Sequence, residues 1–76
     1  MVDMSKSQYS TEYRSIINKL KKARLESGLT QNQVSKMLQK PQSFVSKVES
    51  GERRLDVLEI KHFSRIYNKK INFFIR

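Results

Sequence analysis

The sequence contains no cysteine and a single histidine, and each shortage excludes a class of chemistry. Without cysteine the chain has no disulfide framework, no thiolate zinc site and no thiol nucleophile. His62 alone cannot form a His-rich metal site, so we expect neither a metal nor a cofactor. A Gly-rich loop and paired carboxylates are also missing, and we therefore expect that the protein is not an enzyme.

Long apolar runs are missing as well. No stretch approaches the roughly 18 apolar residues that a membrane span requires. The first ten residues, MVDMSKSQYS, lack the apolar segment of a signal peptide. We therefore expect a cytoplasmic protein with no membrane partner.

Acidic residues are scarce compared with basic ones. Seven Asp and Glu stand against 16 Lys and Arg, which leaves a formal charge of +9 and indicates an anionic partner. With 76 residues, 37% of them hydrophobic, the chain can form one small domain. Residues 1–10 are polar and predict a flexible arm, and residues 11–76 predict the single domain.

Glycine and proline are rare, and the three that occur separate segments with helical periodicity. No alternating strand pattern is present, so we expect an all-α fold. The first helix is predicted from about Thr11 to Ser27, with Gly28 ending it. The second is predicted to start with a capping box at Thr30 and to hold about nine residues, because Pro41 follows.

Pro41 is predicted to open a third helix that ends at Gly51, since its fixed φ suits a first helical turn. A second capping box at Asp56 predicts a fourth helix to about Tyr67. The apolar residues 71–75 predict either one further helical turn or a docked tail.

A set of caps, turn residues and periodic positions lies between Leu20 and Tyr67. It comprises Leu29-Thr30-Gln31, Val34-Ser35, Leu38, the run 42–49 and Gly51-Glu52-Arg53-Arg54. This set resembles the lambda-repressor/Cro-like (XRE) helix-turn-helix family. The resemblance implies a compact bundle of four or five helices whose third helix enters the DNA major groove. It also implies a sequence-specific regulator of transcription that binds double-stranded DNA and acts by occupying its operator.

Other functions fit the same module. A restriction–modification controller and an antitoxin with a toxin partner are both small proteins of this kind. A basic RNA-binding or protein-adaptor module is a more distant alternative, and RNA binding is disfavoured because no aromatic stacking platform is evident.

The exposed arc of the third helix supplies the candidates for base contacts. Gln42 offers an amide that matches adenine, Ser43 suits a base or a phosphate, and Lys47 can reach guanine or a phosphate. Ser46 shares this arc but is short. For Phe44 two alternatives stay open, contact with a thymine methyl or sugar, and packing between the second and third helices.

Phosphate contacts are expected from four further residues. Gln31 stands at the start of the second helix, which crosses the DNA backbone in this family. Lys40 lies in the turn, and Arg53 and Arg54 follow Gly51, where relatives often contact phosphates.

Two structural features follow from the resemblance. Arg24 and Glu49 match family positions that form an ion pair between the first and third helices. Gln39 stands where relatives usually carry glycine, so we expect mild strain there or a slightly different turn.

The apolar C-terminus predicts an interface. Ile71, Phe73 and Phe74 are expected to join two copies of the chain, with Phe73 or Phe74 as anchor, so that a homodimer binds an inverted repeat. The alternative is that these side chains fill the core of the monomer.

Overall fold

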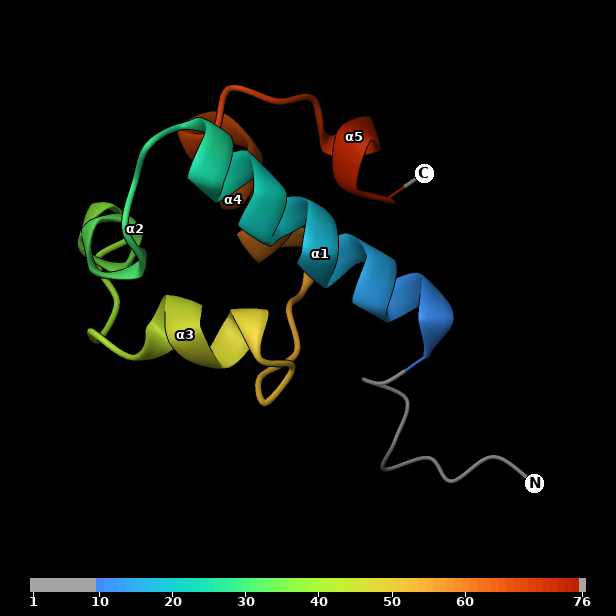
Figure 1. Cartoon of the computed structure of the whole chain (residues 1–76), viewed down its shortest axis with the longest axis horizontal. Coiled ribbons are helices and arrows are strands. Elements are labelled where there is room, and N and C mark those ends of the chain that lie inside the picture. Colours follow the sequence, from blue (N-terminus) through green and yellow to red (C-terminus); the bar gives the residue numbers. More distant parts are fainter. Residues whose placement is uncertain (1–9, 76) are drawn as a thin grey trace.

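Residues 10–75 are described by the computed structural model, and they form five α-helices (Figure 1). The helices are α1 (Thr11–Glu26), α2 (Gln31–Met37), α3 (Phe44–Glu49), α4 (Val57–Ile66) and α5 (Ile71–Ile75). The all-α prediction is confirmed. Apart from Ser10, the predicted N-terminal arm lies outside the described residues.

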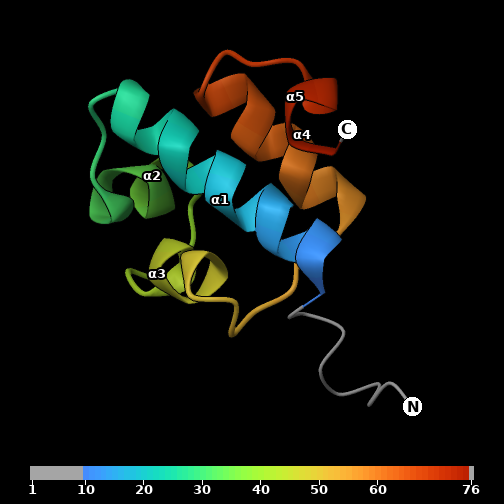
Figure 2. The ribbon, with the colours of Figure 1, turned by 45° about the vertical axis from the view of Figure 1, so that its right-hand side comes forward.

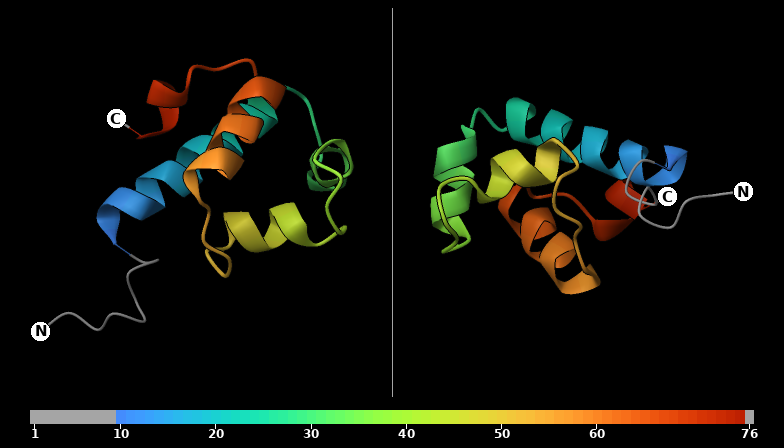
Figure 3. Two further views of the ribbon diagram at one scale, coloured as in Figure 1. Left: turned by 180° about the vertical axis from the view of Figure 1, so that it is seen from behind. Right: turned by 90° about the horizontal axis from the view of Figure 1, so that it is seen from below.

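The longest helix, α1, runs through the middle of the arrangement. It packs against α3 and α5, while α2 packs on α3 and α4 packs on α5. Figures 2 and 3 show α2 at one end of α1 and α5 towards the other end. The helix-turn-helix pair α2 and α3 is therefore held by the rest of the bundle and stands clear of α5.

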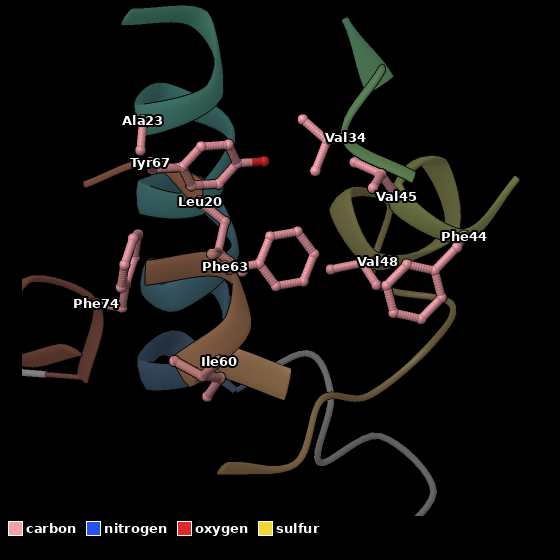
Figure 4. Packing of buried hydrophobic residues seen from close by; sticks show 10 residues of the cluster. All are labelled: Leu20, Ala23, Val34, Phe44, Val45, Val48, Ile60, Phe63, Tyr67 and Phe74. Carbon is pink, nitrogen blue, oxygen red and sulfur yellow. The ribbon is translucent and has the colours of Figure 1, made fainter. Parts of the chain in front are cut away.

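Phe63 of α4 lies at the centre of the core (Figure 4). Its ring stacks on Phe44 of α3, with 6.2 Å between ring centroids, and lies 5.8 Å from the ring of Tyr67. The other buried members of this cluster are Leu20, Ala23, Val34, Val45, Val48, Ile60 and Phe74. One aromatic cluster thus joins α4 to the helix that we expected to face DNA.

Local hydrogen bonds start two of the helices as predicted. The Thr30 hydroxyl accepts from the Gln33 N–H, and the Gln33 side chain accepts from the Thr30 N–H. Asp56 and Glu59 form the same reciprocal pair at the start of α4. Both predicted capping boxes are confirmed.

Glycines stand just past the ends of α1 and α3, as predicted. Gly28 has a φ of 72° and Gly51 a φ of 85°, values that L-residues rarely adopt. Each glycine lets the chain leave a helix in a left-handed conformation.

The predicted start of the third helix at Pro41 is wrong. Residues 42 and 43 form a turn, and α3 begins at Phe44, whose N–H donates to the Pro41 carbonyl. The reason lies in α2, where the buried Ser35 hydroxyl accepts from the Val45 N–H at 3.1 Å and donates to the Gln42 carbonyl at 3.3 Å. A side chain from the neighbouring helix therefore caps α3.

The connection between α2 and α3 is longer than predicted. The helix α2 holds seven residues instead of about nine, because Gln39 already has a φ of 58°. This value confirms the strained alternative for Gln39. A left-handed conformation costs an L-residue roughly 1–2 kcal/mol.

Replacing Gln39 with glycine should therefore stabilise the protein. We expect Gln39→Gly to raise the free energy of unfolding by about 0.5–1 kcal/mol, after allowing for the extra freedom of glycine in the unfolded chain. Urea denaturation measures this change. Asn68, with a φ of 54°, is the matched control, and Asn68→Gly should gain less because asparagine tolerates this conformation. If Gln39→Gly lowered the free energy of unfolding, the positive φ of Gln39 would not be a source of strain.

Candidate nucleic-acid interface

Four polar side chains that we expected to face DNA point to solvent. Gln42, Ser43, Ser46 and Lys47 are all exposed. Gln42 and Ser43 lie in the turn immediately before α3, and Ser46 and Lys47 lie within α3. These four residues form the exposed arc, and their exposure allows them to contact a partner.

A shallow hollow of about 250 Å³ lies on the α3 side of this arc. We call it the α3-side hollow; its lining residues are Lys40, Pro41, Ser43, Phe44, Lys47 and Arg53. Three of these residues are cations and none is acidic. The hollow therefore suits an anion.

A second hollow of about 330 Å³ lies on the α2 side and shares Lys40 with the first. This α2-side hollow is lined by Asn32, Lys36, Lys40 and Gln42. Asn32 and Lys36 were not among the predicted site residues. Asn32 and Lys36 are four residues apart and so share one face of α2. Lys40 lies beyond the end of that helix, so helical periodicity does not join it to the other two.

Phe44 lies in the core, with 6% of its surface exposed. Its burial favours the packing alternative, but the ring stacks on Phe63 of α4, whereas the expected packing was between the second and third helices. Two cations lie over the same ring. The Lys40 Nζ is 5.4 Å and the Arg53 guanidinium carbon 4.8 Å from its centroid. The Phe44 ring thus makes cation–π contacts with Lys40 from the turn before α3 and with Arg53 from the loop after it.

Glu49 connects three elements behind the exposed arc. Its carboxylate accepts two hydrogen bonds from Arg24 of α1, at 2.8 and 3.1 Å, and one from the Gln31 amide of α2, at 3.0 Å. The predicted ion pair between Arg24 and Glu49 is present, with side chains only 9% and 5% exposed. Hydrogen bonding to Glu49 raises the pKa of Arg24.

Gln31 therefore has a partner within the protein. Its amide nitrogen is hydrogen-bonded to Glu49, so this group is occupied in the free protein. Arg24 also donates to the Leu29 carbonyl at 2.9 Å, which fixes the segment leading into α2. The network positions the start of α2 relative to α3.

The two arginines after α3 are held by neighbouring side chains. Arg53 forms a two-point ion pair with Glu59, whose oxygens lie 3.1 and 3.0 Å from Nη1 and Nη2. The guanidinium carbon of Arg54 lies 5.0 Å from the centroid of the Tyr13 ring. Arg53 remains partly exposed, and Arg54 is exposed.

Phe74 is not an exposed dimer anchor, and that expectation is corrected. Its side chain is fully buried in the monomer core, as the alternative for the C-terminus proposed. Ile71 and Phe73 are partly buried against the same core, and the Phe73 ring meets Phe74 edge to face at 5.1 Å. The short α5 has enough contact with α1 and α4 to bury Phe74. The large apolar side chains left exposed among the described residues are Leu25, Met37, Val57, Leu58 and Ile75.

Comparison with known proteins places the chain in a family. A family model described as helix-turn-helix matches residues 20–74, more than two thirds of the chain. No curated protein matches the chain. Among residues 10–75, no helix has both the length and the apolar character needed to cross a bilayer.

Removing the Glu49 carboxylate should be costly. In Glu49→Ala the Arg24 guanidinium stays in a nearly dry site without its partner, so we expect the free energy of unfolding to fall by about 3 kcal/mol. Urea denaturation measures this loss. The control is Glu26→Ala, which breaks the exposed 3.6 Å pair with Lys69 and should cost less than about 1 kcal/mol. Equal losses in the two variants would show that the Glu49 network does not hold the helices together.

Proposed function

The chain belongs to the XRE or lambda-repressor-like helix-turn-helix family of DNA-binding proteins, and from that premise we propose that it regulates transcription by occupying a specific operator in double-stranded DNA. The observation that carries the proposal is the exposure of Gln42, Ser43 and Lys47, which line two hollows together with further cations. We propose no catalysis, since occupancy of a site needs only binding.

Base recognition is assigned to the exposed arc. The Gln42 amide carries a donor and an acceptor, which match N7 and N6 of adenine in the major groove. Ser43 donates to a base or to a phosphate, and Lys47, in the last turn of α3, reaches guanine O6 and N7 or a phosphate. Ser46 is exposed beside them and has a shorter reach. Phe44 is assigned to the core and to the two cations above its ring.

Backbone binding is assigned to the cations that line the hollows. Lys40 belongs to both hollows, Lys36 to the α2-side hollow and Arg53 to the α3-side hollow. Cations on both sides of the base-reading arc neutralise phosphates on either side of the major groove and so set the register of the protein. Arg54 extends the same surface along the loop. Gln31 remains a proposed phosphate contact, through the amide N–H that does not donate to Glu49.

A homodimer on an inverted repeat remains part of the proposal. Two copies related by a two-fold axis would present two α3 helices to half-sites one DNA turn apart. Because Phe74 is buried, the side chains available for such an interface are the exposed Val57, Leu58 and Ile75, with the partly buried Ile71 and Phe73 at its edge.

Selection of bound duplexes from a random DNA pool tests the proposal. We expect a consensus that is an inverted repeat, which would report both base recognition and dimer symmetry. Recovery of no consensus would contradict sequence-specific binding. A consensus without symmetry would contradict the dimer alone.

Two alanine variants separate the proposed roles on the selected duplex. Gln42→Ala should relax specificity at one base pair, with a loss of discrimination of about 1–3 kcal/mol. Lys40→Ala should weaken all duplexes alike and lower the slope of log affinity against log salt by about 1. Competition binding over a series of salt concentrations measures both effects. If Gln42→Ala weakened every duplex equally, its assignment to a base would be wrong.

A further inference from the structure

The loop between α3 and α4 carries two of the proposed phosphate-binding arginines, and a tyrosine from the start of α1 spans it. The Tyr13 hydroxyl accepts a hydrogen bond from the Leu55 N–H at 3.1 Å and donates one to the Arg53 carbonyl at 3.4 Å. These two contacts join parts of the chain that are about 40 residues apart. One side chain thus fixes the backbone on both sides of Arg54.

The remaining anchors of the loop lie on either side of this tyrosine contact. The N–H groups of Glu52 and Arg53 donate to the Lys47 carbonyl at 2.9 and 3.2 Å, which ties the start of the loop to α3. At the other end Asp56 caps α4. Between these anchors, the Arg53 carbonyl and the Leu55 N–H both contact the Tyr13 hydroxyl of α1.

Tyr13 also contacts the arginines of this loop. Its ring lies under the Arg54 guanidinium at 5.0 Å, and its hydroxyl holds the backbone from which the Arg53 side chain reaches Glu59 and the Phe44 ring. Tyr13 is buried, with 8% of the residue exposed, so it does not itself offer a surface to a ligand. Its influence on a ligand must pass through the loop.

We propose that Tyr13 is a positioning residue for DNA backbone binding. Its hydroxyl fixes the path of residues 53–55, so that Arg53 faces the α3-side hollow and Arg54 lies beside it before DNA arrives. Arginine side chains that are ordered in advance lose less freedom on binding, which strengthens the complex. This inference rests on the proposed DNA binding, and it concerns a residue outside the 20–74 range that the family model matches.

The test separates the hydroxyl of Tyr13 from its ring. Tyr13→Phe keeps the packing and the face beneath Arg54 but removes both hydrogen bonds. The matched control is Tyr67→Phe, because the buried Tyr67 hydroxyl has no hydrogen-bond partner among the described residues. Affinity for a mixed-sequence duplex at low salt is the readout, since backbone binding does not need the operator.

We expect Tyr13→Phe to weaken binding by about three- to tenfold. This range corresponds to the net free energy of a typical hydrogen bond within a protein. Tyr67→Phe should bind like the unchanged protein. In Tyr13→Phe the Leu55 amide should also exchange faster with solvent, whereas the amides of α2 should not change. Circular dichroism confirms that each variant is folded at the temperature of the assay.

A double-mutant cycle shows whether Tyr13 acts through the arginines. In a protein that carries Arg53→Ala and Arg54→Ala, adding Tyr13→Phe should weaken binding no further. The paired alanine variant leaves Tyr13 in place, and it should itself lose affinity. A full additional loss in the triple variant would overturn the proposal, as would an unchanged affinity in the paired alanine variant.

The outcomes distinguish this inference from the function on which it rests. If the unchanged protein binds no duplex, both are refuted. If it binds duplex DNA and Tyr13→Phe binds equally well, the role of Tyr13 alone is refuted.

Discussion

The part of the molecule that carries α2 and α3 depends on one buried carboxylate. Glu49, at the end of α3, accepts hydrogen bonds from Arg24 of α1 and from Gln31 of α2. Because a buried charge is tolerated only with partners, this group restricts the three helices to arrangements that satisfy it. The α3 helix has only six residues and would not be stable alone, so its orientation has to come from such contacts. This network therefore also fixes the orientation of the exposed arc of Gln42, Ser43 and Lys47.

Aromatic rings organise the positive charge around that arc. Phe44 belongs to the core and stacks on Phe63, yet Lys40 and Arg53 lie over the same ring. Tyr13 does the same for Arg54. A chain with a net charge of +9 would attract DNA anywhere on its surface by charge alone. The rings of Phe44 and Tyr13 and the Glu59 carboxylate hold particular cations in place. These cations therefore form a surface of defined geometry.

Local features of the sequence predicted local features of the fold. The capping boxes at Thr30 and Asp56 were predictable because their hydrogen bonds join residues three apart. The start of α3 was not, because its cap is Ser35 on another helix. Phe74 was misplaced for the same kind of reason: its burial depends on the space between helices, which periodicity does not report. Of the site, the exposed polar arc was predicted, whereas Asn32, Lys36 and the cations over Phe44 emerge only when α2, α3 and the following loop are brought together.

We propose that the exposed arc before and within α3 is the surface that meets duplex DNA. The decisive experiment is a titration of the isotope-labelled protein with a selected duplex, followed by amide chemical shifts in NMR. We expect the largest shift changes at Gln42, Ser43 and Lys47, smaller ones at Lys36 and Arg53, and almost none in α5. Large changes confined to α5 and the outer face of α1, with the arc unchanged, would show that DNA binds elsewhere.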